Sequence, residues 1–352
     1  MRRLVGWALV GLLVLGLGAE AFAARSQYGP AKTRQRARRS ATARTHTKLV
    51  RFAPPRESLR VPSLASAPDP ADDIAVRAAS AILIDGNSGE VLYALNPDAI
   101  RAPASITKIL TALVILENGK LDDTVVVSRT AAETGGFRLG LRTGQRIRLD
   151  DLLAAILIRS ANDAAVAAAE HVGGSLDGFV TLMNRTAQDL GMTNSHFANP
   201  HGLDHPFHYT TARDMAIVAR VALENPTFAA LVRAREARVT IWTSGRRALT
   251  PQPRLVLSHN RLLDMVAGAD GVKTGFTGSA GKTLVASASR GNQRMIAVLL
   301  NDPQRWSDAA TLLEYGFGSA RKSSAAPTPT ESSTPAFLWD VKAGGPAPPD
   351  GL

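Results

Sequence analysis

Strand patterns at both ends of the region from residue 73 to residue 320 enclose a helical middle, and this order limits the possible folds most strongly. Apolar runs at 81–85 and 90–95 flank a Gly-Asn-Ser-Gly turn, and similar runs at 282–290 and 294–300 flank a Gly-Asn turn. Helical periodicity is found at 106–118, 150–159, 163–171, 178–190, 211–223 and 307–315, and a further strand pattern at 237–242. The sequence therefore predicts an α+β fold, in which antiparallel strands from the N- and C-terminal parts form one sheet packed against helices, with a mostly helical subdomain.

Residues 1–24 have the three parts of a secretory signal peptide. Two arginines precede an apolar run from Leu4 to Gly18, and small residues end at Ala23 and Ala24, where cleavage is expected. An uncleaved signal anchor is the alternative interpretation. The chain has no cysteine, which fits a protein that works outside the cytoplasm without disulfides and excludes thiol nucleophiles and thiolate metal sites.

The net charge of +11 is concentrated in one segment. Residues 25–60 contain eleven Lys or Arg and one Glu, so the folded region is essentially neutral. We expect residues 25–72 to be a disordered basic arm and linker, able to contact anionic cell-surface polymers or membrane lipids. DNA is the formal alternative partner, but the export signal disfavours it, so we predict no nucleic-acid binding. Residues 321–352 are rich in Pro, Ser, Thr and Ala and are predicted to be a disordered tail.

A serine and a lysine stand three residues apart at the predicted start of the helix 106–118. Pro103 disfavours a helical conformation for the residue before it, so Ser105 lies at or near the helix start. Lys108 follows one turn later, with its amine within reach of the serine oxygen. A desolvated lysine can accept the proton of a serine nucleophile, although S-x-x-K is also common as a capping serine followed by a solvated lysine.

Two further motifs follow at a distance and complete the groups that acyl transfer needs. Ser160 and Asn162 come after an apolar helix; the serine would relay a proton and the amide would contact a substrate peptide. Lys273, Thr274 and Gly275 would provide a cation, a hydroxyl for a carboxylate and a close backbone approach, and the amides of Ser105 and Phe276 would bind an oxyanion. Each motif alone also fits a helix cap or an ordinary turn.

The chain from residue 76 to residue 318 resembles the low-molecular-mass penicillin-binding proteins that act as serine D-alanyl-D-alanine carboxypeptidases. Besides the three motifs, the similar stretches are 102–108, 191–197, 199–204, 211–214 and 270–275. The resemblance implies a β-lactamase/transpeptidase-like fold and removal of the terminal D-alanine from peptidoglycan stem peptides through an acyl-serine intermediate. It also implies covalent inhibition by β-lactams, a role in cell wall biogenesis and cell shape, and a periplasmic or cell-surface location.

The chain departs from this family in two ways. Many members continue with a β-rich domain and an amphipathic anchoring helix, whereas only a short tail follows residue 320 here. Attachment through the basic N-terminal arm is the corresponding expectation. Phe276 occupies a position where some relatives have histidine, which leaves the substrate preference open.

Four other functions are alternatives to this interpretation. A D-alanyl-meso-diaminopimelyl endopeptidase would have the same fold and motifs, so the sequence separates it poorly. A class A β-lactamase would need a Glu-x-x-Leu-Asn motif, which is absent between Asn162 and Lys273. A zinc peptidase could use His201, His205 and His208, but prolines interrupt them and no Glu lies between, so we predict no metal and no cofactor. A non-catalytic peptidoglycan- or anionic-surface-binding protein would not need the complete set of motifs.

Overall fold

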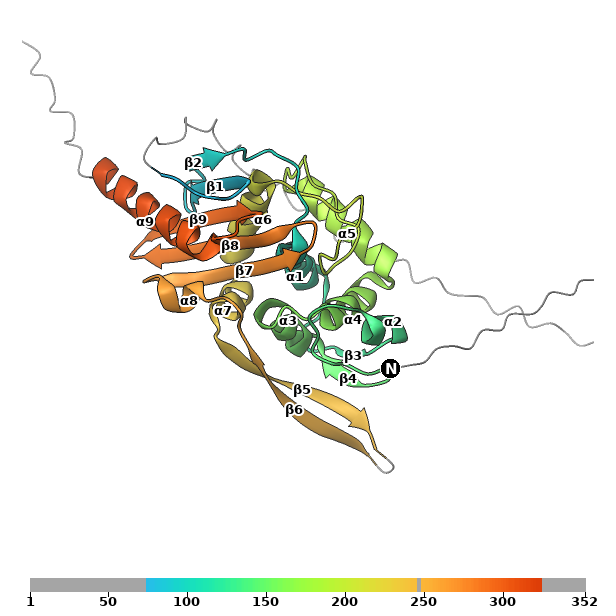
Figure 1. Cartoon of the computed structure of the whole chain (residues 1–352). Helices are drawn as coiled ribbons and strands as arrows, with labels where there is room; N and C mark the ends of the chain where they lie inside the picture. The colour runs from blue at the N-terminus through green and yellow to red at the C-terminus, as the bar shows by residue number, and fades with distance from the viewer. Residues whose placement is uncertain (1–73, 246–247, 325–352) are drawn as a thin grey trace, which may run out of the picture. The chain divides into compact units, whose positions relative to one another are not determined.

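The computed structural model describes residues 74–245 and 248–324, and a five-stranded antiparallel sheet forms its centre (Figure 1). In spatial order its strands are β2 (Val91–Leu95), β1 (Ser80–Asp85), β9 (Gln293–Leu300), β8 (Gly281–Arg290) and β7 (Ala269–Thr277). Strand β1 pairs with β9, from Ser80 opposite Leu300 to Asp85 opposite Met295. Strands from the two ends of the domain therefore form one sheet, which confirms the predicted α+β fold.

The predicted helices are present, and short ones were missed. The described residues include one 3-10 helix, η1 (Ala104–Thr107). The α-helices are α1 (Lys108–Asn118), α2 (Arg129–Glu133), α3 (Leu149–Ile158), α4 (Asn162–Gly173), α5 (Leu176–Asp189), α6 (Ala212–Glu224), α7 (Pro226–Arg233), α8 (Leu262–Met265) and α9 (Arg305–Ser324). Helix α9 begins before residue 307 and runs past residue 320, where the sequence predicts the domain to end. The predicted signal peptide (1–24), the basic arm (25–72) and the tail beyond residue 324 lie outside the described residues.

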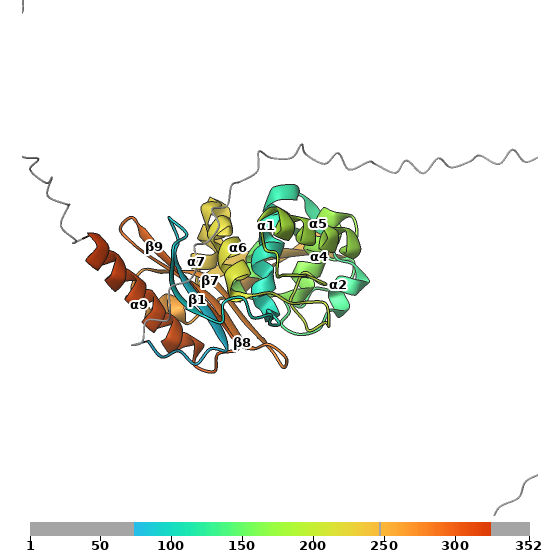
Figure 2. The ribbon, with the colours of Figure 1, turned by 90° about the horizontal axis from the view of Figure 1, so that it is seen from above.

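Helices cover both faces of the central sheet. Figure 2 shows α9 on one side and α6 with α1 on the other. Along β1, Ala81 and Leu83 belong to the core beneath α9, whereas Ile82 and Ile84 belong to the larger core on the opposite face. Because neither face meets water, the central strands are continuous apolar runs rather than polar and apolar alternations.

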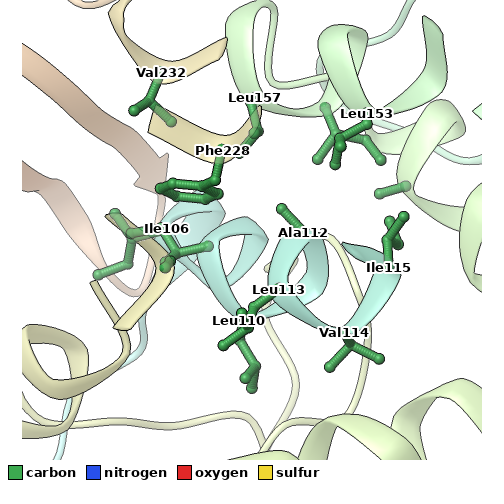
Figure 3. Close-up of a cluster of buried hydrophobic side chains, with 14 of the residues drawn as sticks. Ile106, Leu110, Ala112, Leu113, Val114, Ile115, Leu153, Leu157, Phe228 and Val232 are labelled. Carbon is green, nitrogen blue, oxygen red and sulfur yellow. The ribbon is translucent and has the colours of Figure 1, made fainter. Parts of the chain in front are cut away.

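Helix α1 passes through the larger core. All its residues from Lys108 to Ile115 are buried, and Figure 3 shows apolar side chains of α3 and α7, among them Leu153 and Phe228, in the same cluster. A helix that is apolar on every side is stable only when protein surrounds it. The sequence thus carries Lys108, at the first position of this helix, into the protein interior.

A smaller sheet lies beside the helical part. Its strands follow the order β3 (Thr124–Val126), β4 (Arg146–Arg148), β5 (Glu236–Ser244) and β6 (Leu249–Leu257). The sequence predicted β5 but not β6, because Pro251 and Pro253 argue against a strand. Pro251 lies opposite Trp242, and Pro253 lies opposite Thr240. Both prolines belong to β6, an edge strand of this sheet, and they stand two residues apart, so both face the same way. On the outer side of an edge strand, the N–H group that proline lacks would have no strand partner, so no hydrogen bond is lost.

Helix α7 was also missed, for a related reason. Pro226 lies beyond the end of the predicted helix 211–223 and begins the next helix. The Asn225 side chain caps this helix by accepting from Thr227 N and Phe228 N. In the described part of the chain, no single helix has the length and apolar composition of a membrane span. Helices α6 and α7, bent by 106° at their junction, meet these criteria only as a pair.

Candidate active site

The predicted nucleophile lies in a tight turn that joins β2 to helix α1. Ala104 adopts φ +53°, and residues 104–107 form the 3-10 helix η1 before the α-helix begins at Lys108. Ser105 therefore lies in the 3-10 turn directly before the α-helix, near the helix start as the sequence predicted. Its side chain is only partly buried, whereas its neighbours Ala104 and Ile106 are fully buried. The turn thus holds one hydroxyl at the surface of a rigid core.

The amine of Lys108 lies next to this hydroxyl and has three polar neighbours. Its Nζ atom is 3.0 Å from Ser105 Oγ, 2.6 Å from Asn162 Oδ1 and 2.6 Å from the carbonyl oxygen of His201. Burial lowers the pKa of Lys108 well below its usual value, and the positive charge of Lys273 lowers it further. In the neutral amine, the amide and carbonyl oxygens accept its two hydrogens, which leaves the lone pair for the serine proton.

Ser160 and Lys273 form a second pair. Lys273 Nζ donates to Ser160 Oγ at 2.9 Å and to the carbonyl oxygen of Thr274 at 2.9 Å. Burial lowers the pKa of Lys273 to about 7, and the charge of Arg305 acts in the same direction. Ser160 has φ +65° and lies between Arg159, the C-cap of α3, and Ala161, the N-cap of α4. Neither Ser160 nor Asn162 is thus the N-cap of α4, and the Ser160 hydroxyl instead accepts from Lys273.

Asn162 makes hydrogen bonds within the protein that the sequence did not predict. Both ends of its amide are used within the protein, since Oδ1 accepts from Lys108 and Nδ2 donates to the Gly135 carbonyl at 2.8 Å. Its backbone N–H donates to the carbonyl of Phe137. The second hydrogen of Nδ2 and the second lone pair of Oδ1 take part in neither of these two contacts, so the contact between Asn162 and a substrate peptide stays a prediction. In this structure Asn162 orients the lysine and attaches the loop containing Gly135 to the site.

A buried carboxylate, which the sequence analysis did not identify, holds the continuation of that loop. Asp163 is fully buried and accepts hydrogen bonds from the backbone N–H groups of Leu139, Gly140 and Leu141. Ala164 N–H is a fourth donor, and the guanidinium of Arg138 lies 4.0 Å from Asp163 Oδ2, so backbone donors and a nearby cation together stabilise the buried carboxylate. One wall of the site is thus fixed by the residue next to Asn162.

The third motif lies inside strand β7, at the edge of the central sheet, and not in a turn before a strand. A Cβ atom at Gly275 would lie 2.9 Å from the backbone nitrogen of Ser105, which real side chains do not tolerate. Thr274 is partly buried and Phe276 is 62% exposed. Glycine thus allows β7 to lie directly against the nucleophile turn, which brings all three motifs together.

A second glycine packs against the same turn. Gly202 has φ +89°, and a Cβ atom there would overlap the carbonyl of Ala104 and lie 3.0 Å from Ser105 N. The adjacent His201 supplies the carbonyl oxygen that accepts from Lys108. Sequence reasoning missed both contributions because they are made by the backbone.

Arg305, at the start of α9, also reaches the site. Its Nη1 atom donates to the carbonyl oxygen of Gly275 at 2.6 Å and to that of Thr283 at 3.1 Å. The helical pattern in the sequence starts only at Ser307, so it did not include the arginine. The sequence did contain a hint of this contact, because an arginine follows soon after the strand hairpin that comes next after the Lys-Thr-Gly motif.

The histidines that suggested zinc do not form a metal site. No group of three His, Cys, Asp or Glu side chains in the described ranges has a suitable arrangement. His208 Nδ1 accepts from the backbone N–H of Ala198, and its Nε2 lies 2.8 Å from Thr107 Oγ1. Burial lowers the pKa of His208 to about 4 and that of His201 to about 3. His208 is therefore part of the protein's own hydrogen bonding.

Comparison with known proteins identifies the family. Residues 65–304 match the family described as D-alanyl-D-alanine carboxypeptidase. The D-alanyl-D-alanine carboxypeptidase DacF of Bacillus subtilis is 38% identical over 253 residues, which are 70% of this chain and 63% of that protein. The chain likewise spans only 60 and 62% of the length of two further relatives, from Escherichia coli and Haemophilus influenzae.

Solved structures agree with this match. The D-alanyl-D-alanine carboxypeptidase DacD from Francisella tularensis has a TM-score of 0.64 at 30% identity, over 72% of this chain and 73% of that one. A mutant of a Streptomyces DD-transpeptidase has a TM-score of 0.66 at 28% identity, over 69% of this chain and 99% of that one. The resemblance noted in the sequence is thus confirmed, and the chain belongs to the D-alanyl-D-alanine carboxypeptidase family.

Proposed function

We propose that the protein is a serine D-alanyl-D-alanine carboxypeptidase that removes the terminal D-alanine from peptidoglycan stem peptides. The observation that carries the proposal is the position of Lys108 Nζ, 3.0 Å from Ser105 Oγ and held by two oxygen acceptors at 2.6 Å. A desolvated amine in this position can act as the base that a serine nucleophile requires. The names of the relatives supply the substrate class.

In the proposed acylation, Ser105 Oγ attacks the carbonyl carbon of the penultimate D-alanine while its proton passes to the Lys108 amine. The backbone N–H groups of Ser105 and Phe276 stabilise the negative oxygen of the tetrahedral intermediate. The C–N bond then breaks, and the departing nitrogen takes a proton delivered through the Ser160 hydroxyl, which accepts from Lys273. The products are an acyl-serine and free D-alanine.

Before deacylation, Lys108 gives up the proton that it took from Ser105, and this proton replaces the one that the Ser160–Lys273 pair gave to the departing nitrogen. Water then attacks the acyl carbon and gives its proton to the neutral Lys108 amine. The ester bond to Ser105 Oγ breaks, and the serine oxygen recovers a proton from the lysine. A β-lactam would acylate the same serine, but its leaving nitrogen stays attached to the acyl group and obstructs water. The protein is thus expected to be inhibited covalently by β-lactams.

A carboxypeptidase must also hold a terminal carboxylate. In this proposal the Thr274 hydroxyl and the ammonium of Lys273 hold the carboxylate, and the guanidinium of Arg305, which contacts the carbonyl oxygen of Gly275, is a second cation nearby. The preference for a chain end over an internal peptide bond would follow from these charges. An endopeptidase acting on crosslinks would make less use of them.

The proposed substrate places the protein outside the cytoplasm. The signal-peptide pattern of residues 1–24 supports export to the periplasm or cell surface, and the basic residues 25–60 would attract anionic polymers or lipids there. We include this location and this attachment in the proposal.

Measuring D-alanine release tests the proposed reaction. The full-length protein is incubated with a synthetic stem pentapeptide and, separately, with a crosslinked stem-peptide dimer. We expect D-alanine from the pentapeptide, no release by Ser105→Ala, and no effect of EDTA. Faster cleavage of the dimer than of the pentapeptide would instead assign the protein as an endopeptidase, and release by Ser105→Ala would refute the serine mechanism.

A further inference from the structure

Behind the nucleophile turn, a chain of three hydrogen bonds connects a buried histidine to the backbone of Ala104. The backbone N–H of Ala198 donates to His208 Nδ1 at 3.0 Å. His208 Nε2 lies 2.8 Å from Thr107 Oγ1, and the Thr107 hydroxyl donates to the carbonyl oxygen of Ala104 at 2.8 Å. All of these side chains are buried, and the ring of Phe197 packs edge-on against the imidazole at 5.6 Å.

The donors in this chain can have only one order. Because a backbone N–H can only donate, Nδ1 of His208 must be the unprotonated nitrogen, and the neutral ring carries its hydrogen on Nε2. Nε2–H therefore donates to Thr107 Oγ1, which leaves the hydroxyl hydrogen for the Ala104 carbonyl. A proton added to Nδ1 would point at the N–H of Ala198, so the first of the three hydrogen bonds, from Ala198 N–H to Nδ1, would be lost.

The last acceptor lies in the peptide unit that contains the Ser105 N–H. The Ala104 carbonyl and the Ser105 N–H belong to one rigid trans peptide plane, so fixing the oxygen also fixes the direction of the N–H. Ala104 reaches this position with φ +53°, which is unfavourable for alanine and must be held by its surroundings. Gly202 packs against the same carbonyl and leaves no room for the plane to rotate on that side.

We propose that His208 and Thr107 are positioning residues, which aim the Ser105 N–H at the developing oxyanion by holding the Ala104 carbonyl. The catalytic part of this inference rests on the proposed function, in which that N–H is one of two oxyanion donors. The role requires a neutral imidazole. Burial and the neighbouring His205 and His196 disfavour its proton, as does Lys108, while the carboxylate of Asp204 favours it; the pKa of His208 is lowered to about 4.

Nuclear magnetic resonance tests the first half of the inference without any enzymatic assay. In full-length protein with 15N-labelled histidine, we expect His208 to have a protonated Nε2 and an unprotonated Nδ1 from pH 8 down to about pH 5. Thr107→Val should shift the Nε2 resonance, because that variant removes its acceptor. A proton on Nδ1 at neutral pH, or no change in Thr107→Val, would overturn the proposed hydrogen-bond chain even if the protein proved not to be a peptidase.

Acylation kinetics test the second half. His208→Asn keeps an acceptor near Nδ1 for Ala198 N–H but has no donor for Thr107, whereas His208→Gln places an amide N–H near Nε2. Because losing a whole oxyanion donor costs about 10²–10³-fold, misdirecting one should lower the acylation rate constant for a fluorescent penicillin about tenfold in His208→Asn and Thr107→Val. The double variant should be no slower than either single variant, and His208→Gln should recover most of the rate.

Two controls separate positioning from stability. His171→Asn changes a histidine that contacts Asp123 and is not part of the chain, so its acylation rate should equal that of the wild type. The initial non-covalent Kd for penicillin should be unchanged in every variant. Lower Tm values with normal acylation of the folded protein, or effects that simply add in the double variant, would show a structural role only and refute the proposal. An unlabelled wild type would refute the proposed function and, with it, the catalytic half of the inference.

Discussion

Gly202→Ala should nearly abolish acylation while leaving the protein folded. The added methyl group would overlap the Ala104 carbonyl and crowd Ser105 N, and both partners are backbone atoms that cannot rotate away. An L-residue at φ +89° costs about 1–2 kcal/mol. Overpacking adds about 1–3 kcal/mol, so the total of about 2–5 kcal/mol approaches but need not exceed the stability of a domain. A displacement of the nucleophile turn by about 1 Å should lower the acylation rate about 100-fold.

Gly191→Ala is the matched control for this experiment. Gly191 has φ +79°, but a Cβ atom there would have no neighbour within 4 Å. This variant should be less stable than the wild type by about 1–2 kcal/mol, the conformational cost of the left-handed backbone alone, and should acylate at the wild-type rate. The assays are fluorescent-penicillin labelling kinetics and urea denaturation of both variants. Normal acylation by Gly202→Ala would refute the argument that this glycine is required by the contact with Ala104.

Three further predictions concern ionisable groups. Lys108→Met should lower the acylation rate about 10³-fold, which is the usual effect of losing a general base, and stopped-flow labelling measures this rate. The variant should not lose stability, because burying the amine costs desolvation energy, and denaturation checks this. The acylation rate should fall as the pH rises through about 7, because the Lys273 ammonium loses its proton and its positive charge there. An acylation rate that stays constant between about pH 6 and 9 would contradict the proposed role of the Lys273 cation. Burial raises the pKa of Asp302 to about 6, so its folded form binds a proton more tightly than its unfolded form; Asp302→Asn should raise Tm above pH 6, and the gain should shrink as the pH falls toward 4.

The sequence was sufficient to predict the fold and to predict that the three motifs lie close together. Apolar strand patterns at both ends predicted the shared sheet, and that sheet places Lys273 on β7 against the turn that contains Ser105. Side-chain chemistry at fixed spacing predicted Ser105, Lys108 and Ser160 as site residues, and the structure pairs Ser105 with Lys108 and Ser160 with Lys273. These features are predictable because hydrophobic periodicity and functional side chains are visible in the sequence itself.

The parts that were missed depend on the backbone or on proline in an uncommon role. The carbonyl of His201 holds Lys108, and no side-chain pattern announces a carbonyl. The positive φ of Ala104 is imposed by its surroundings and contradicts the local preference of alanine. Strand β6 and helix α7 contain prolines that usually end such elements, and only the edge position of the strand and the first position of the helix make them acceptable.

The hydrogen bonds of Asn162 illustrate a third difficulty. The sequence shows that the amide is present, but its contacts with Lys108 and Gly135 come from distant segments. Which of two partners an amide prefers depends on distances that spacing along the chain does not determine. Residue types were therefore easier to predict than their hydrogen bonds.

Mass spectrometry of the full-length protein after incubation with penicillin tests the central claim most directly. The account predicts a mass increase of one penicillin per chain, located by peptide mapping on Ser105, and no increase in Ser105→Ala. A wild-type protein that stays unmodified, or an adduct that persists in Ser105→Ala, would contradict the claim that Lys108 activates this serine as a nucleophile.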